Sequence, residues 1–231
     1  MKVIGLIGGM SWESTVPYYR VINQVVGETL GGLHSAKMVL YSVDFQEIEQ
    51  LQHAGRWTEA GEVLAAGGRG LQRAGADFLV LCTNTMHKVA PQIEAAVDVP
   101  LLHIADATAA RVRAAGARRV GLLGTRFTME EDFYRGRLER GHGLEVLVPR
   151  SEQRDTVHRI IYEELCRGAV RDESRGQYQQ IVRDLVDQGV TGVILGCTEI
   201  GLLLGPDDAE VPLFDTARIH AEEAARYCLT P

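Results

Sequence analysis

Residues 78–89 read FLVLCTNTMHKV, and residues 193–203 read VILGCTEIGLL. Each stretch opens with a short apolar run that predicts a buried strand. Each then passes a cysteine and a threonine and enters a segment that predicts a helix. Buried strands that alternate with helices are typical of a parallel α/β sheet. Ligands of such sheets bind beyond the carboxyl ends of the strands, so we expect functional side chains where these two stretches leave their strands.

The segments around these two stretches recur in the same order, which indicates an internal duplication. RVGLLGT (119–125) repeats VIGLIGG (3–9), TGVILGC (191–197) repeats DFLVLCT (77–83), and VPLFDT (211–216) repeats VPLLHI (99–104). We therefore predict an α/β fold of two pseudo-symmetric Rossmann-like lobes, each with a parallel sheet flanked by helices. The active site is expected in the cleft between the lobes. The predicted N-terminal lobe comprises residues 1–108 and 211–231, and the C-terminal lobe residues 109–210.

In the first half, apolar periodicity and turn residues place the individual elements. Strands are predicted at residues 2–8, 37–43, 78–82 and 99–104. Helices are predicted over residues 12–28, 58–74, 85–96 and 106–115. Gly75 and Gly116 are the expected stop signals after two of these helices.

The composition limits the classes of protein to which this chain can belong. Of its 231 residues, 45% are hydrophobic and 24% are charged, as in an ordinary globular protein. The net charge of −7 argues against nucleic acid or an anionic membrane as the main partner. No apolar run approaches the ~18 residues of a membrane span. The four cysteines, at positions 82, 166, 197 and 228, have neither disulfide-framework nor zinc-site spacing, so we expect free thiols, no metal and a cytoplasmic protein.

Cys197 follows Gly196 at the end of a predicted strand, and Thr198 and Glu199 open the predicted helix after it. A thiol at a helix N-terminus lies near the positive end of the helix dipole, so we expect its pKa to fall below ~8.5. The resulting thiolate could act as a base or as a nucleophile. The alternative is a buried and inert cysteine, which is the commoner fate of a lone cysteine.

Thr83, Asn84 and Thr85 occupy the corresponding place in the first half. One interpretation is a helix N-cap, a role in which Thr and Asn are common. The other is a carboxylate site, because free backbone N–H groups, hydroxyls and amides hold anions at helix starts. Two such sites would hold a small anion, with Cys197 on one side and Thr83 or Cys82 on the other. The glycines of residues 5–9 lack the G-x-G-x-x-G spacing of a dinucleotide site.

The chain resembles the PLP-independent aspartate/glutamate racemase family, which is related to glutamate racemase and hydantoin racemase. The motifs that carry the resemblance are IGLIGGMSWEST (4–15), LGGLHSA (30–36), CTNTMHKV (82–89), LLGTRFTM (122–129) and LGCTEIGLL (195–203). They are most similar to the L-aspartate/glutamate-specific or broad-specificity amino-acid racemases. The resemblance implies an isomerase with two Rossmann-like lobes, no cofactor, and two thiols on opposite faces of the substrate α-carbon.

One motif departs from the pattern of this family. The usual first motif is C-N-T-x-H, whereas here Thr83 precedes Asn84 and Cys82 lies one place earlier. Successive strand side chains point to opposite faces, so Cys82 should face the packed side if Thr83 faces the ligand. We therefore assign catalysis to Thr83 and Cys197, with the Cys197 thiolate as base. The expected substrate-binding residues are Met10, Gln52, Asn84, Thr85, Met86, Thr198 and Glu199.

The resemblance implies interconversion of L- and D-aspartate or L- and D-glutamate. In some members a lysine and an arginine bind the side-chain carboxylate of the substrate. Cys166 aligns with the lysine, and residues 43–57 contain no clear counterpart of the arginine, so a broader range of amino acids stays open. Two other functions also stay open: a maleate-type isomerase or arylmalonate-type decarboxylase that uses the same cysteine, and a non-catalytic small-anion binding protein. The family usually forms dimers, so we expect a homodimer.

Overall fold

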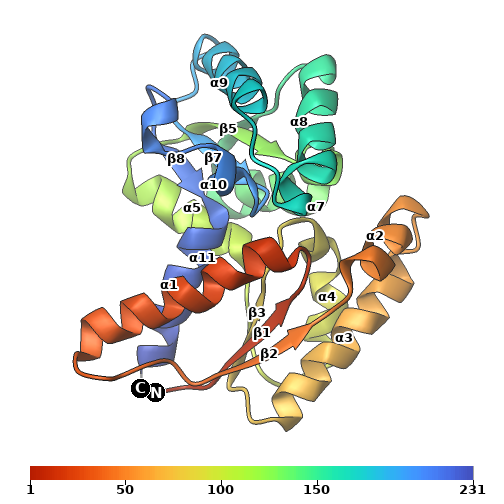
Figure 1. Cartoon of the computed structure of the whole chain (residues 1–231), viewed down its shortest axis with the longest axis vertical. Helices are drawn as coiled ribbons and strands as arrows, with labels where there is room; N and C mark the ends of the chain where they lie inside the picture. Colours follow the sequence, from red (N-terminus) through yellow and green to blue (C-terminus); the bar gives the residue numbers. More distant parts are fainter. Residues whose placement is uncertain (231) are drawn as a thin grey trace. The chain divides into compact units, whose positions relative to one another are not determined.

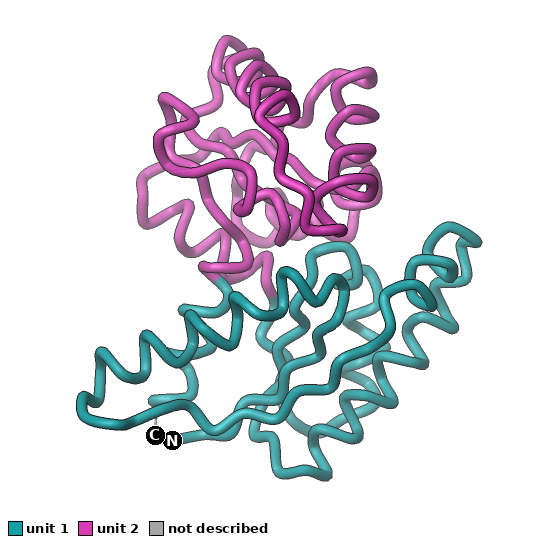
Figure 2. Tube along the Cα trace, viewed as in Figure 1, with its two compact units in different colours: residues 1–103, 220–231 teal, residues 104–219 magenta. Residues whose placement is uncertain are grey.

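A computed structural model describes residues 1–230 of the chain. Unit 1 contains residues 1–103 and the C-terminal segment from residue 220, and unit 2 contains residues 104–219 (Figure 2). Each unit holds one four-stranded sheet whose strands are all parallel, and helices flank each sheet (Figure 1). The predicted α/β fold with two parallel sheets is therefore confirmed.

The sheet of unit 1 has the strand order β2-β1-β3-β4. Its strands are β1 (Ile4–Gly8), β2 (Met38–Ser42), β3 (Phe78–Leu81) and β4 (Leu101–Leu102). Its helical segments are α1 (Trp12–Leu30), α2 (Phe45–His53), α3 (Trp57–Arg73), the 3-10 helix η1 (Thr85–Val89) and α4 (Ala90–Glu94). The strands β1 and β3 are buried along their whole length, as expected of strands covered on both faces, and β2 is a partly exposed edge strand.

Two glycines of β1 allow helices to approach both faces of this sheet closely. A Cβ added to Gly5 would lie 3.2 Å from Leu71 of α3, and closer still to Leu79 of β3. A Cβ added to Gly8 would overlap Thr15 of α1. Because the two glycines are three residues apart, they point to opposite faces, so α3 covers one face and α1 the other.

The helices of unit 1 depart from the predicted ones in two places. The predicted helix over residues 85–96 is divided into η1 and α4, because Pro91 lacks an N–H donor and restricts the residue before it. The sequence patterns do not predict α2, whose start is capped by Asp44: its carboxylate accepts a hydrogen bond from the Gln46 N–H at 2.9 Å.

Unit 2 repeats this topology with the strand order β6-β5-β7-β8. Its strands are β5 (Arg119–Gly124), β6 (Glu145–Leu147), β7 (Val193–Gly196) and β8 (Leu213–Asp215). Its helical segments are α5 (Ile104–Ala114), α6 (Arg126–Glu130), α7 (Asp132–Gly136), η2 (Arg137–Gly141), α8 (Ser151–Glu163), η3 (Leu165–Arg167), α9 (Asp172–Val186), α10 (Ile200–Leu203), η4 (Pro206–Asp208) and the first turn of α11 (Thr216–Leu229).

Side chains of the central strands of unit 2 alternate between two apolar cores. Leu123 and Leu195 pack with α8 and α9 in one core, whereas Leu122 and Ile194 pack with α5 in the other. Cys197 lies two residues after Leu195, so its side chain points to the same face and belongs to the core of α8 and α9.

The chain passes from unit 1 to unit 2 at residues 103–104 and returns at residues 219–220, inside α11. Strand β8 pairs with β7, so it belongs to the sheet of unit 2. The predicted lobes instead divide at residues 108 and 211, which would place β8 in the other lobe. Within residues 1–230, no helix combines the length and the apolar character needed to cross a bilayer.

Candidate active site

The registers of the two sheets place Thr83 and Cys197 at equivalent positions. Gly5 of β1 pairs with Leu79 of β3, and Gly121 of β5 pairs with Val193 of β7. Thr83 lies four residues after Leu79, and Cys197 lies four residues after Val193. Each residue therefore lies just beyond the carboxyl end of the third strand of its own sheet. Because strand side chains alternate with a period of two, a residue four positions after Leu79 or Val193 points to the same face of the strand as that residue. Cys82 has no such relation to Cys197.

Cys82 is fully buried, and its thiol lies 3.8 Å from the Val80 carbonyl oxygen. Burial alone raises the pKa of the Cys82 thiol far above its usual range. This thiol is a poor base, because its thiolate would have to form in an apolar environment and its hydrogen-bond partner, a carbonyl oxygen, cannot take up the proton. Thr83 is also buried, and its carbonyl oxygen accepts a 2.7 Å hydrogen bond from Nδ1 of His87.

The predicted substrate-binding residues of unit 1 gather around the ends of β1 and β3. Asn84 begins η1 without a side-chain capping bond, so the simple N-cap interpretation of this residue is wrong. Nε2 of Gln52, on α2, donates to Sδ of Met86 at 3.0 Å. Met86 and Met10 belong to one apolar core. Met10, Gln52, Asn84, Thr85 and Met86 are all buried.

Three buried histidines, His87, His103 and His220, form a group beside Thr83. The sequence patterns do not predict the contacts of the His87 ring with the other two rings. The ring centroids of His87 and His103 are 4.3 Å apart, and those of His87 and His220 are 6.0 Å apart. Nε2 of His220 donates to the Leu102 carbonyl at 2.9 Å, so its Nδ1 accepts from the Tyr18 hydroxyl, also at 2.9 Å. Burial lowers the pKa of His220 to about 4, and this imidazole is neutral near pH 7. His220 reaches this place because α11 returns to unit 1.

In unit 2 the three predicted residues form a compact hydrogen-bonded group at the end of β7. Sγ of Cys197 donates to Oε2 of Glu199 at 3.0 Å, and the Thr198 hydroxyl donates to the same oxygen at 2.9 Å. All three side chains are buried. A thiol that donates to a carboxylate can pass its proton to that carboxylate, which is the arrangement of a nucleophile or base with its own proton acceptor.

The prediction that the helix dipole lowers the pKa of Cys197 is wrong. Burial raises the pKa of this thiol well above its usual range, and the neighbouring Glu199 and Cys166 raise it further. The helix that follows, α10, spans only Ile200–Leu203 and begins three residues after the cysteine. Such a short helix has a small dipole, and the effect falls off within one turn. Cys197 is therefore a protonated thiol in this state of the protein.

Cys166 and Tyr178 complete the surroundings of Cys197. Cys166 lies in η3 and packs against the same apolar core as Cys197. Burial raises the pKa of Cys166, and Glu199 raises it further. The hydroxyl of Tyr178 donates to the Val157 carbonyl at 3.1 Å. Because Tyr178 is buried close to these acidic groups, its pKa is also raised well above its usual value.

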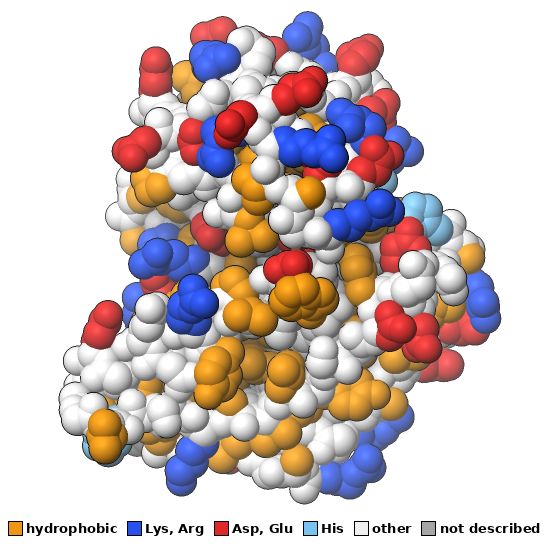
Figure 3. Space-filling view, viewed as in Figure 1, with side chains coloured by type: hydrophobic (Ala, Val, Ile, Leu, Met, Phe, Trp, Pro, Cys, Tyr) orange, Lys and Arg blue, Asp and Glu red, His pale blue; other side chains and the backbone are white. Residues whose placement is uncertain are grey.

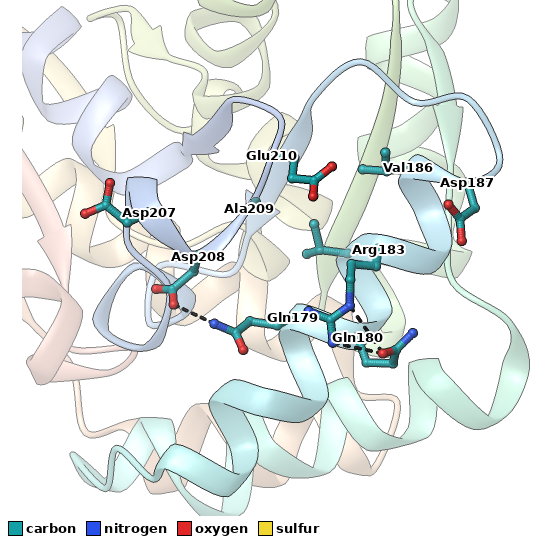
Figure 4. A pocket seen from close by; sticks show the side chains of 10 residues that line it. Gln179, Gln180, Arg183, Val186, Asp187, Asp207, Asp208, Ala209 and Glu210 are labelled. Atoms are coloured by element: carbon teal, nitrogen blue, oxygen red, sulfur yellow. Dashed lines mark hydrogen bonds between the residues drawn. The ribbon is translucent and has the colours of Figure 1, made fainter.

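A pocket of about 460 Å³ lies elsewhere in unit 2, between α9 and the segment around η4 (Figure 4). It contains none of the predicted site residues. Its polar side chains bond to one another: Gln179 donates to Asp208 and Arg183 donates to Gln180, each at 2.8 Å. Within residues 1–230, no group of three or more His, Cys, Asp or Glu side chains is arranged to hold a metal ion.

Comparisons with known proteins identify the relatives of this chain. The profile of the Asp/Glu/Hydantoin racemase family matches residues 7–224. A crystal structure of a candidate Asp/Glu racemase from Yersinia pestis is 59% identical, with a TM-score of 0.92 and full coverage of both chains. The structure of an aspartate racemase homologue from Pyrococcus horikoshii OT3 is 35% identical, with a TM-score of 0.85 and full coverage of both chains. The broad specificity amino-acid racemase of Bacillus subtilis (strain 168) is 24% identical over 224 residues, 93% of each protein.

The profile covers almost the whole chain, and the two similar structures extend over both units. The resemblance noted in the sequence motifs is therefore confirmed, as is the assignment to a class of isomerases. The chain belongs to the Asp/Glu/Hydantoin racemase family.

Proposed function

We propose that this protein is a cofactor-independent racemase that interconverts the L and D forms of aspartate or glutamate. One observation carries the proposal: in a member of this family, the thiol of Cys197 donates to the Glu199 carboxylate at the carboxyl end of β7. Racemisation needs a base that can remove a weakly acidic α-proton, and this pair supplies a sulfur base together with an acceptor for its proton.

The proposed reaction begins when the proton of Cys197 moves to Glu199. The thiolate then takes the α-proton of the substrate, so an S–H bond forms as the C–H bond breaks. Burial makes the free thiolate costly, which means that it forms only when the substrate is bound. A bound ammonium group and the loss of the negative charge on Glu199 both favour it.

Thr83 is proposed to stand on the opposite face of the α-carbon. Its hydroxyl donates a proton to the carbanion, and the resulting Thr83 alkoxide takes a proton from water. The hydroxide left by that water removes the proton held by Glu199, while Cys197 keeps the proton taken from the substrate, so all three side chains return to their starting protonation. A threonine hydroxyl is a very poor base near pH 7, so Thr83 gives a proton much more readily than it takes one. Proton removal by the protein is therefore expected to be fast for one enantiomer and slow for the other.

The carbanion must also be stabilised through the substrate carboxylate, which gains negative charge as the proton leaves. We assign this role to the backbone N–H groups and side chains of Asn84, Thr85 and Thr198. Gln52 is proposed to contact the side chain of the substrate, since its amide lies on α2 beside Met86. Met10 and Met86 would form the apolar floor of this part of the site.

Several further properties belong to the same proposal. Catalysis needs no cofactor, because proton transfer and carboxylate stabilisation use side chains of this chain alone. All four cysteines are free thiols, which suits work in the reducing cytoplasm. The partner is a small amino acid, and the protein is proposed to act as a homodimer.

Proton NMR in deuterium oxide tests this function with L- and D-aspartate and L- and D-glutamate. We expect the α-proton signal of one enantiomer to disappear rapidly and that of the other slowly. Cys197→Ala should abolish the exchange. Cys82→Ser is the matched control, because it alters the buried thiol that precedes Thr83 in the chain and should leave most of the exchange intact.

Each half of the proposal has its own contrary outcome. The folded protein could show no exchange with any amino acid and yet convert a dicarboxylic acid that has no amino group. That result would contradict the racemase function and indicate a different enzyme of this fold. Equal exchange of both enantiomers would remove Thr83 from the opposite face. Loss of exchange in Cys82→Ser but not in Cys197→Ala would transfer the role of base to Cys82.

A further inference from the structure

Helix α1 carries a row of exposed apolar side chains. Trp12, Val16 and Tyr19 follow one another at spacings of four and three residues, so they lie along one stripe of the helix. Their exposed fractions are 62%, 48% and 64%. Two large aromatic rings and a valine in one stripe are unusual on a surface that only contacts water.

Leu40 extends this stripe onto the neighbouring edge strand β2. Its side chain is 51% exposed, and it lies on the same side of Gly8 as Thr15 of α1. Hydrophobic side chains gather over α1 and β2 on this face of unit 1 (Figure 3). We refer to Trp12, Val16, Tyr19 and Leu40 as the α1 patch. Its exposed area is on the order of 400–500 Å², the size of the largest apolar patch on a typical monomer, which is often a functional surface.

The charged residues beside the α1 patch make it complementary to a copy of itself. Glu13 and Arg20 are seven residues apart, so they lie on the same flank of α1 with Val16 near the midpoint. At a rise of 1.5 Å per residue, each lies about 5 Å from that midpoint along the helix axis. An antiparallel second α1, related by a twofold axis near Val16, would bring Glu13 beside the partner's Arg20. The same ion pair would form twice.

We propose that the α1 patch is the surface through which two copies of this chain associate, with their α1 helices antiparallel. The patch supplies about half of the ~800 Å² per partner that a stable interface buries, and the polar side chains around it supply the rest. The partner's Arg20 would also approach the Trp12 ring, where a guanidinium is favoured by the ring electrons. This inference names the surface of the homodimer proposed above and does not depend on the racemase chemistry.

Sedimentation velocity and light scattering over a range of protein concentrations test the surface. We expect the wild-type protein to be a dimer and Val16→Asp to raise its dissociation constant at least ~30-fold, as for a central interface residue. Leu33→Asp is the matched control: Leu33 is fully exposed in unit 1 but lies outside the patch, and this variant should dimerise like the wild type.

A charge exchange tests the antiparallel arrangement itself. Glu13→Arg alone places two arginines together at each contact, and Arg20→Glu alone places two glutamates together. Each single variant should weaken the dimer about 10-fold, and the double variant should return to within about threefold of the wild type. Recovery in the double variant also shows that the single variants fold.

Each contrary outcome points to a different fault in the proposed surface. A monomeric wild-type protein at tens of micromolar would overturn the proposed surface and the proposed dimer together. A dimer unaffected by Val16→Asp and by both charge variants would overturn the surface alone, since association would then use another face. Loss of the dimer in both single charge variants without recovery in the double variant would overturn the antiparallel pairing. Exchange of the substrate α-proton, measured on the same samples, reports the racemase activity separately.

Discussion

Replacing Glu199 by glutamine tests the proposed proton path most directly. The variant keeps the size of the side chain and removes its charge and its ability to take a proton. Sγ of Cys197 and Oε2 of Glu199 are 3.0 Å apart. Two unit negative charges at that distance repel each other by about 5.5 kcal/mol at an effective dielectric constant of about 20. A thiolate beside an ionised Glu199 is therefore strongly disfavoured, so the departing proton has to reach that carboxylate.

Two effects of opposite sign should follow from Glu199→Gln. We expect kcat/KM for the rapidly exchanged enantiomer to fall by about 10²–10⁴-fold, the usual contribution of a positioned proton acceptor. The same change removes a charge that raises the pKa of Cys197, so the pKa of this thiol should fall. Iodoacetamide should then alkylate Cys197 faster than in the wild type near pH 8, as followed by mass spectrometry of the peptide that carries it.

Glu164→Gln is the matched control for the loss of a buried carboxylate. Glu164 also lies buried in unit 2, where it accepts a 2.6 Å hydrogen bond from the Ser174 hydroxyl, but it has no proposed part in the reaction. A kcat/KM of Glu199→Gln within about threefold of the wild-type value would exclude Glu199 as the acceptor of the Cys197 proton. Lower reactivity of Cys197 toward iodoacetamide in this variant would also contradict the proposed proton path, because Glu199 would then not be raising the pKa of Cys197.

Three further predictions concern separate parts of the fold. Thr83→Cys places a thiol on the proposed second face of the substrate and should bring the α-proton exchange rates of the two enantiomers closer together, as measured by NMR in deuterium oxide. His220 has a pKa of about 4 in the folded protein and 6.5 as its ordinary value. The neutral His220 imidazole therefore contributes fully to the stability of the folded protein above about pH 6.5. This contribution, about 3 kcal/mol in total, is lost as the pH falls toward 4. Urea unfolding at several pH values should show a smaller decrease in the free energy of unfolding for His220→Gln than for the wild type. Gly9 has a φ of 92°, and a Cβ there would overlap the Val43 backbone, so Gly9→Ala should lower the free energy of unfolding in urea by about 2–3 kcal/mol.

The sequence alone was sufficient for the architecture and the family. Buried strands produce continuous apolar runs and their glycine turns recur, so the two copies of the sheet can be recognised from local patterns. The prediction failed where local patterns conflict or are weak. Pro91 interrupts an otherwise helical segment, and α2 is too short and polar for its periodicity to stand out.

The sequence also determined which residues end the two equivalent strands, because a strand has a fixed period of two and the duplication aligns Thr83 with Cys197. It did not determine the protonation of that cysteine. The pKa of a thiol depends on the water removed around it and on charges brought near it from other elements, and only the tertiary structure sets both. The same reason applies to His220, which joins the histidines beside Thr83 because α11 crosses back into unit 1. Contacts between residues more than a hundred positions apart leave no trace in the local pattern of the chain, so they are decided by the folded structure.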